Sequence, residues 1–212
     1  MSEALDAVVA GARGLSVAHR AALIAIDGVD GSGKTTFTAR LVDALRPSSM
    51  TVVHADDHLH PPEIRHARGR SSPEGFWLDT YDLPSMIAAV DDACRALDDG
   101  TFVIVEGMFL HREELRDRWD FSVLLDVPFA VTAARMAERD GTNPDPEHAS
   151  MRRYVGGQRL YFGAASPWRH ADLVVDNSAD DARVIEAESS FAATAGKPPH
   201  PGSAPFAHRR AL

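Results

Sequence analysis

The residues best suited to chemistry lie in one short segment, Gly28 to Thr35, which reads Gly-Val-Asp-Gly-Ser-Gly-Lys-Thr. It fits the spacing G-x-x-x-x-G-K-[ST], in which glycines let successive backbone N–H groups point inward at phosphate oxygens. Lys34 can reach the β- and γ-phosphates of a nucleotide, and the Thr35 hydroxyl can bind Mg²⁺. The predicted nucleotide-binding residues are Gly28, Asp30, Gly31, Ser32, Gly33, Lys34, Thr35 and Thr36.

The sequence on either side of this segment is that of a strand-to-helix turn. Residues 21–27 (AALIAID) form a short apolar run typical of a buried parallel strand, and residues 35–45 (TTFTARLVDAL) have apolar side chains at helical spacing. The helix N-terminus would add partial positive charge next to the phosphates. The alternative, a glycine-rich turn that binds nothing, is disfavoured by this placement.

An aspartate follows the next apolar run, residues 50–55 (MTVVHA). In open parallel sheets ligands bind just beyond the carboxyl ends of the strands, so we expect Asp56 to face the same crevice as Lys34. We also expect its strand to neighbour the strand before the phosphate loop. At that place Asp56 could take the proton of an acceptor hydroxyl as a catalytic residue. The alternative is that it caps a turn, which is the role we assign to Asp57.

A second carboxylate closes the apolar run at residues 101–105 (TFVIV). An acidic residue at the end of a buried strand downstream of a phosphate loop has the layout of a Walker B carboxylate. Such a carboxylate orients Mg²⁺ directly or through water. We therefore predict that Thr35 and Glu106 lie on the metal side of the site.

Residues 58–82 are irregular in sequence and mix proline and glycine with histidine, arginine and aromatic residues. A loop of this length inside a compact domain is usually functional or disordered. A stacking surface with charged groups nearby suits a small polar acceptor, whereas Phe76 and Trp77 could instead anchor the loop to the core. His58 and His60 have no third ligand at a recognisable spacing, which disfavours a zinc site. The candidate substrate residues of this loop are His58, Phe76 and Tyr81.

Two arginines further along, Arg135 and Arg139, are spaced i, i+4 and so share one face of a predicted helix. Two guanidinium groups on one side can clamp a phosphoryl group during its transfer, which makes both arginines candidate catalytic residues beside Lys34. The alternative is that they are solvated partners of Glu138 and Asp140.

Five short apolar runs alternate with helical segments, which predicts an α/β fold with a right-handed, mostly parallel sheet. With the phosphate loop, this is the three-layer α/β/α arrangement of a P-loop NTPase with five strands. The glycine pair Gly156-Gly157 interrupts a helical segment and suggests a hinge, and residues 182–191 favour a last helix. We expect one domain over residues 1–194, followed by a mobile tail, 195–212, rich in proline, glycine and alanine.

The composition narrows the function classes. The chain has 212 residues, a formal net charge of −9 and a pI near 5.5, which argues against an extended nucleic-acid surface. Its one cysteine, Cys94, cannot form an internal disulfide. No stretch approaches 18 apolar residues, and the N-terminus lacks the pattern of a signal peptide. We expect a cytoplasmic protein with a small-molecule substrate and neither nucleic-acid nor membrane partners; the sequence does not indicate its oligomeric state.

Several short motifs occur in one order along residues 20–178, and in that order they resemble the phosphoribulokinase/uridine kinase branch of P-loop nucleoside kinases. The chain is most similar to compact bacterial members of the uridine kinase type. The matching segments are Gly28–Thr35, Asp56-Asp57, Ser72–Phe76, Glu106-Gly107, Arg135–Asp140, Arg153-Tyr154 to Tyr161, and Ala171–Asn177.

The resemblance implies ATP and Mg²⁺ as cofactors and the 5′-hydroxyl of a nucleoside as acceptor. It makes Asp56 the acid/base, Glu74 a ribose contact and Glu106 a metal-side carboxylate. It also implies lid arginines at Arg135 and Arg139, and it adds Arg153 to the candidate substrate residues.

Two departures from the family pattern concern the acceptor. The aromatic turn Asp-x-Phe-Tyr is replaced by Asp56-Asp57-His58-Leu59, and the hairpin that reads the base has no counterpart between Tyr81 and Glu106. Because discrimination depends on buried polar groups that pair with the right substrate, the acceptor is left open between a nucleoside and another small alcohol, such as a sugar or a pantothenate-like molecule. An ATP-binding regulatory module without an acceptor is a third hypothesis. A GTPase switch is disfavoured, because neither Asn143 nor Asn177 is followed by lysine.

Overall fold

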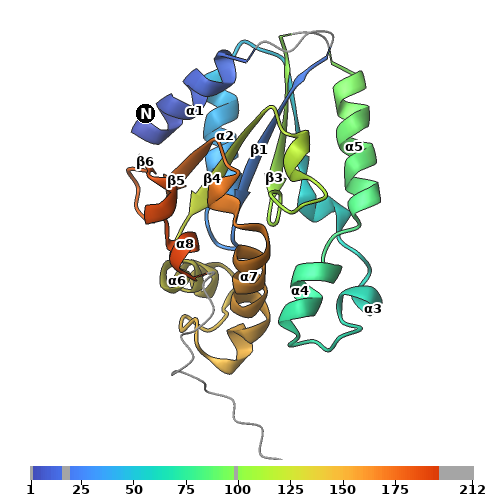
Figure 1. Cartoon of the computed structure of the whole chain (residues 1–212), viewed down its shortest axis with the longest axis vertical. Helices are drawn as coiled ribbons and strands as arrows, with labels where there is room; N and C mark the ends of the chain where they lie inside the picture. The colour runs from blue at the N-terminus through green and yellow to red at the C-terminus, as the bar shows by residue number, and fades with distance from the viewer. Residues whose placement is uncertain (1, 16–19, 98–99, 196–212) are drawn as a thin grey trace, which may run out of the picture.

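The computed structural model describes residues 2–15, 20–97 and 100–195, which form a twisted sheet with helices on both faces (Figure 1). The strands are β1 (Ala22–Gly28), β2 (Met50–His54), β3 (Phe102–Gly107), β4 (Phe121–Asp126), β5 (Leu173–Asp176) and β6 (Arg183–Ile185). The helices are α1 (Glu3–Arg13), α2 (Lys34–Leu45), α3 (Pro62–Arg65), α4 (Pro73–Asp79), α5 (Leu83–Arg95), α6 (Phe129–Asp140), α7 (Arg152–Ala165) and α8 (Phe191–Ala195). The 3₁₀ turns are η1 (Ala55–His58), η2 (Arg116–Arg118), η3 (Ala149–Met151), η4 (Pro167–Arg169) and η5 (Ala187–Ser189).

The sheet order is β2-β3-β1-β4-β5-β6, with parallel pairing from β2 to β5. The predicted three-layer, mostly parallel α/β/α fold is thus confirmed, but the number of strands was wrong. The sixth strand, β6, pairs antiparallel with β5 where we predicted the start of a helix. It is three residues long and partly exposed, so it lacks the apolar run that marks the other strands.

The predicted neighbour of β1 was also wrong. Strand β3 lies between β2 and β1, and it pairs Ile24 of β1 and Val52 of β2 with its own Ile104. Glu106, at the end of β3, is therefore beside the phosphate loop, and Asp56 follows a strand one place further out. All these strands still end at the same edge of the sheet, so both carboxylates remain on the side of the loop.

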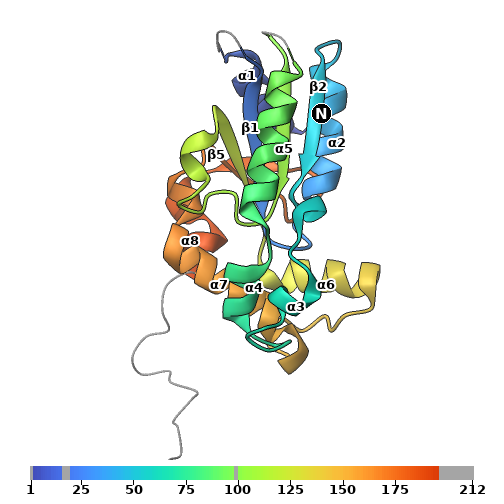
Figure 2. The same cartoon turned by 90° about the vertical axis from the view of Figure 1, so that its right-hand side faces the viewer.

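Alternating side chains of the sheet form two apolar layers. In β1, Ile24 and Ile26 face α1 and α2, whereas Leu23 and Ala25 face the layer that includes α5 and α7. Helices α3, α4, α6 and α7 gather beyond the carboxyl edge of the sheet, as both views show (Figures 1 and 2). This placement leaves the helices on both faces to stabilise the sheet, while the segments at its carboxyl edge are available for binding.

Helix α7 runs without a break through Gly156 and Gly157, so the predicted hinge is wrong. The two glycines allow α7 to approach α4 closely. A Cβ atom at Gly156 would lie 2.7 Å from a side-chain carbon of Pro73, and one at Gly157 would lie 2.7 Å from the ring of Phe76. Close packing, and not flexibility, accounts for the pair.

The expected C-terminal tail begins at the end of α8, and its residues 196–212 lie outside the described residues. Within the part of the chain that the structure describes, none of the helices has both the length and the apolar character needed to cross a membrane.

Candidate active site

The phosphate loop connects β1 directly to α2. Gly31 and Gly33 have φ values of 76° and 87°, in the left-handed region that favours glycine, and α2 starts at the next residue, Lys34. A Cβ atom at Gly33 would lie 2.9 Å from Nδ2 of Asn177, which donates a 2.7 Å hydrogen bond to the carbonyl of Ser32. Asn177, which follows β5 two strands away from β1, therefore holds the loop in place, a role that the sequence did not indicate.

The loop has the features that phosphate binding requires. Lys34 lies over it, with Nζ 3.0 Å from the Val29 carbonyl oxygen. Among the described residues, the backbone N–H groups of Gly33, Lys34 and Thr35 have no protein hydrogen-bond acceptor. Free N–H groups at a helix N-terminus, next to a lysine, suit the anionic oxygens of a nucleotide.

The structure places the two predicted metal-side residues in contact. Thr35 Oγ1 donates a 3.1 Å hydrogen bond to Oε1 of Glu106, which is buried at the end of β3. His54 Nδ1 lies 2.7 Å from the same oxygen, because the register of β2 and β3 places His54 beside Glu106. A hydroxyl and a carboxylate are hard oxygen donors that suit Mg²⁺, which usually takes its remaining ligands from phosphates and water.

Our sequence analysis did not identify His54, although its place as the last residue of a strand at this edge was the available signal. Within the described residues, this site included, no group of three or more histidine, cysteine, aspartate or glutamate side chains gathers in a metal-binding arrangement.

Asp56 lies in η1, two residues after His54, with an exposed side chain. Its Oδ1 accepts a 2.8 Å hydrogen bond from the Tyr81 hydroxyl. Asp57 is also exposed and has no hydrogen bond to a described residue. His58 turns towards α5, where its Nδ1 lies 3.0 Å from Oγ of Ser85.

The 58–82 loop contains α3 and α4, and it begins and ends at neighbouring positions. Its two ends pair through a bridge between Leu59 and Tyr81, flanked by hydrogen bonds from His60 N to the Thr80 carbonyl (3.0 Å) and from Asp82 N to the His58 carbonyl (2.8 Å). This backbone pairing at the two ends of the loop fixes Tyr81 relative to η1.

The inner side of this loop is anchored to α7, which agrees with the anchoring alternative for Phe76. Phe76 is 5% exposed and packs edge-on against Phe109 and Tyr154 at centroid distances of 5.5 and 5.2 Å. Arg153 is also buried, and it donates to the carbonyls of Arg65 (3.1 Å) and Ser72 (3.4 Å). Both side chains hold the loop in place.

Glu74, the predicted ribose contact, is exposed in the first turn of α4. It accepts a 3.1 Å hydrogen bond from Ser72 Oγ, so the carboxylate lies at the N-terminal end of that helix.

The two arginines predicted to act as a lid bond to protein groups, and the structure does not bring them together on one ligand site. Arg135 Nη2 donates to the carbonyls of Asn177 (3.0 Å) and Ser178 (3.1 Å), and it lines a cavity of about 210 Å³ beside the loop. Arg139 pairs with Asp140 and, at 3.4 Å, with Asp30 of the phosphate loop. The hydrogen bond to Asp140 and the charges of both aspartates raise the pKa of Arg139. The other described residues that line the cavity are Gly33, Thr36, Phe37, Arg40, Asn177, Ala179 and Asp180.

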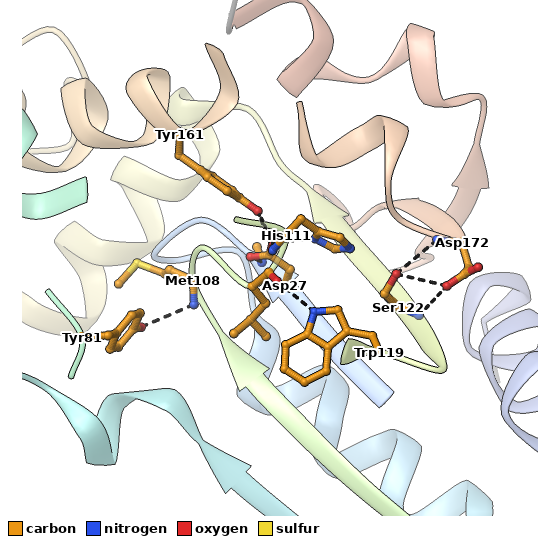
Figure 3. Close-up of polar contacts among 10 residues, drawn as sticks. Asp27, Tyr81, Met108, His111, Trp119, Ser122, Tyr161 and Asp172 are labelled. Carbon is orange, nitrogen blue, oxygen red and sulfur yellow. Dashed lines mark hydrogen bonds and ion pairs between the residues drawn. The ribbon is translucent and has the colours of Figure 1, made fainter. Parts of the chain in front are cut away.

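A fully buried carboxylate, Asp27, immediately precedes the phosphate loop, and Figure 3 shows its contacts with His111 and Tyr161. Its Oδ1 accepts from the backbone N–H of Gly28 (2.7 Å), and its Oδ2 accepts from His111 Nδ1 (2.7 Å) and from the Tyr161 hydroxyl. Burial alone would raise the pKa of Asp27, but the hydrogen bond and attraction to His111 and the hydrogen bond from Tyr161 outweigh it and hold the pKa below its usual value. This network links β1, the segment after β3, and α7.

A parallel sheet with this loop between its first strand and a helix, and with an acidic residue ending the adjacent strand, defines a P-loop NTPase fold. A family model described as "AAA domain" matches residues 24–156, more than half of the chain, and the chain belongs to this family. Together with the relatives below, this identifies the protein as a uridine kinase-like P-loop kinase, which confirms the resemblance seen in the sequence.

Two curated relatives are kinases. A "Uridine kinase" from Deinococcus deserti is 26% identical over 179 residues, which cover 72% of this chain and 86% of that protein. A "Thymidylate kinase" from Xanthomonas euvesicatoria pv. vesicatoria is 30% identical over 195 residues, which cover 77% of this chain and 79% of that protein.

Two solved structures share the fold, each with a TM-score of 0.62 over 80% of this chain. One is a "Possible Uridine Kinase" from Bacillus stearothermophilus, 23% identical and covered over 96% of its length. The other is a "putative fructose transport system kinase" from Silicibacter, 24% identical and covered over 98% of its length.

Proposed function

We propose that the protein transfers the γ-phosphoryl group of ATP to an alcohol of a small acceptor, and that a nucleoside 5′-hydroxyl is the first acceptor to test. The observation that carries the proposal is the continuous set of contacts at the carboxyl edge of the sheet. Thr35 bonds Glu106, Glu106 bonds His54, and Asp56 follows His54 by two residues. A candidate base thus lies on the same edge as the phosphate loop.

In this proposal each half of the site has one task. The N–H groups of the phosphate loop and Lys34 bind and orient the phosphates, and Thr35 and Glu106 would hold Mg²⁺, which supplies charge neutralisation on the phosphoryl group. Asp56 orients the acceptor hydroxyl and receives its proton. Arg135 and Arg139 remain predicted lid arginines, and the cavity lined by Arg135 and Arg40 is our candidate for the nucleotide base.

The acceptor could also be a different small alcohol, and one observation favours this second candidate. The segment that follows Tyr81 forms α5 and then β3, and between Asp82 and Leu97 the structure contains no strand. Nothing in that described segment can serve as a base-reading hairpin. A sugar or pantothenate-like alcohol would not need one. We further propose that the protein acts in the cytoplasm, without a nucleic-acid or membrane partner, in keeping with its net charge of −9.

The test is ADP release from MgATP with a panel of nucleosides, sugars and vitamin-like alcohols. We expect release that depends on one class of alcohol and is lost in excess chelator. ATP consumption that is independent of every alcohol would instead favour a regulatory module.

A matched pair of variants locates the acceptor side. Asp56→Asn keeps size and one acceptor oxygen but cannot take a proton, so we expect turnover to fall by about 10²-fold with little change in ATP affinity. Asp57→Asn is the control, and it should have a far smaller effect. The reverse result would make Asp57 the base, and no effect in either would contradict the proposed acceptor site.

A further inference from the structure

Tyr81, the residue whose side chain bonds Asp56, is both buried and fixed. Its side chain is 3% exposed, and its ring lies 6.3 Å from that of Phe109. The backbone pairing with Leu59 holds its Cα in place. Its hydroxyl lies between two partners, Asp56 Oδ1 at 2.8 Å and the backbone N–H of Met108 at 3.4 Å (the latter drawn in Figure 3).

This geometry leaves Tyr81 little capacity for a ligand. Its hydroxyl donates its single proton to Asp56 and accepts from Met108 N. Burial, together with the charge and hydrogen bond of Asp56, holds the pKa of Tyr81 well above its ordinary value, so the hydroxyl stays a donor. The substrate role that we predicted for Tyr81 therefore does not fit its surroundings as well as a role that acts through Asp56.

The two oxygens of Asp56 are in different positions. Oδ1 is held by Tyr81, whereas Oδ2 has no hydrogen bond to any described residue. The Asp56 side chain is exposed, and without Tyr81 its carboxylate would be free to rotate. One buried donor thus reduces the orientations of a carboxylate that must face a hydroxyl within about 3 Å.

We propose that Tyr81 is a positioning residue that holds Asp56 with Oδ2 turned towards the acceptor hydroxyl. This inference rests on the proposed function. In the transfer step, the O–H bond of the acceptor breaks and its proton goes to Oδ2. The acceptor oxygen forms a bond to the γ-phosphorus, and the bond from that phosphorus to the β,γ-bridging oxygen breaks, with its electron pair leaving on ADP. Tyr81 keeps its proton and its bond to Oδ1 throughout.

The test is a double-mutant cycle with Tyr81→Phe and Asp56→Asn in the full chain, measured with the acceptor found in the panel. Tyr81→Phe should lower kcat by about 10-fold and leave the KM for ATP within about twofold, since only orientation is lost. In the Asp56→Asn background the same change should have little further effect. Tyr154→Phe is the control, because that hydroxyl has no hydrogen bond to a described residue, while its ring packs on Phe76 as the ring of Tyr81 packs on Phe109.

Three outcomes would overturn the inference. Equal losses of kcat from Tyr81→Phe in both backgrounds would show a general structural role, and a rise in acceptor KM at unchanged kcat would return Tyr81 to the substrate contacts. An unchanged enzyme would show that Asp56 needs no positioning.

A second cycle, with Tyr81→Phe and Asp56→Ala, measured on the free energy of unfolding separates this inference from the proposed function, because alanine removes the oxygen that accepts from Tyr81, whereas asparagine would keep it. Non-additive effects there would show that the two side chains interact in solution, whether or not an acceptor is found. If the wild type transferred no phosphoryl group to any alcohol while this coupling was present, the proposed function would fail and the contact would stand. If the coupling was absent from an active enzyme, the inference alone would fail.

Discussion

The phosphate loop and the 58–82 loop lie at the same edge of the sheet, but they are held in different ways. The phosphate loop connects a strand buried along its whole length to a helix, and the buried carboxylate of Asp27 bonds its first N–H group from below. The 58–82 loop leaves the sheet at η1, and it is attached through the Leu59–Tyr81 bridge, the packing of Phe76 on α7 and the hydrogen bonds from Arg153. One of its polar substrate candidates, Glu74, is exposed.

This difference separates two kinds of specificity. Binding phosphates requires backbone N–H groups in one geometry, which a strand-to-helix turn inside the core provides. Recognising an acceptor requires side chains that can vary without disturbing the sheet, which a loop at its edge provides. Under the proposed function, the phosphate loop therefore indicates the class of reaction, and the 58–82 loop would determine the substrate within that class.

The largest effect should come from the phosphate loop. Lys34→Ala should leave the fold intact and lower phosphoryl transfer by about 10²-fold or more, because positioning and charge stabilisation are nearly all that such a site contributes. The measurement is ADP release at saturating MgATP and acceptor. Arg95→Ala, at the exposed end of α5, is the control. Near-normal turnover in a folded Lys34→Ala protein would contradict the nucleotide half of the comparison.

The second prediction compares the two aspartates in stability. Asp27→Asn should lower the free energy of unfolding by about 3 kcal/mol, because it removes the charge that His111 and Tyr161 bond and places an N–H donor against theirs. Asp56→Asn, at an exposed site, should change it by less than about 1 kcal/mol. Urea denaturation of both variants gives the two values. Equal losses would mean that the two halves of the site are equally embedded in the core.

The pH dependence of stability gives a further check on Asp27. Its pKa in the folded protein is lowered, so its contribution is fully present above its unfolded pKa of about 3.9 and is lost as the pH falls through the lower, folded value. The free energy of unfolding of the wild type should therefore decrease more steeply below about pH 4 than that of Asp27→Asn. Parallel curves would show that Asp27 is not held as a carboxylate.

The same contrast explains what the sequence could predict. Local patterns predict the phosphate loop, its strand and its helix. They also predict the Thr35–Glu106 contact, since the phosphate loop and Glu106 each follow an apolar run. Local patterns do not predict the order of β2, β3 and β1 in the sheet, because parallel strands with the same apolar runs can pair out of sequence order. Gly156-Gly157 is locally unfavourable in a helix, and only the approach of α4, some 80 residues away in sequence, accounts for it.

Buried polar contacts were the hardest part of the site to predict. Asp27 and Tyr161 are 134 residues apart, and their hydrogen bond leaves no periodic signal in the sequence. The same holds for Tyr81 and Asp56, which are 25 residues apart. Both tyrosines are typical core residues by type, and only the fold shows that their hydroxyls bond to carboxylates.

A third prediction concerns motion. Nucleotide alone should slow hydrogen exchange in the phosphate loop, whereas nucleotide with acceptor should also slow it in residues 58–82 and 139–153, by about 10-fold, as closure excludes water from the transfer. Its motivation is the proline- and glycine-rich 58–82 loop alone, since α7 is continuous. Hydrogen exchange with mass spectrometry distinguishes the two states. Identical exchange in both segments, with and without ligands, would show that the acceptor half is as rigid as the phosphate half.

The smallest effect should come from Arg139, which lies near the end of α6 beside the phosphate loop. Its side chain is 61% exposed, and its guanidinium already bonds Asp140 and Asp30. An exposed ion pair is typically worth no more than about 1 kcal/mol, so Arg139→Ala should lower turnover by less than about 10-fold. Arg135, which bonds two carbonyls beside the phosphate loop, should matter more when replaced by alanine. The two variants are compared by kcat at saturating substrates. If Arg139→Ala cost about 10²-fold or more, Arg139 would have to leave its aspartates and clamp the phosphoryl group during transfer, and the lid would then be a part of the site that forms only on closure.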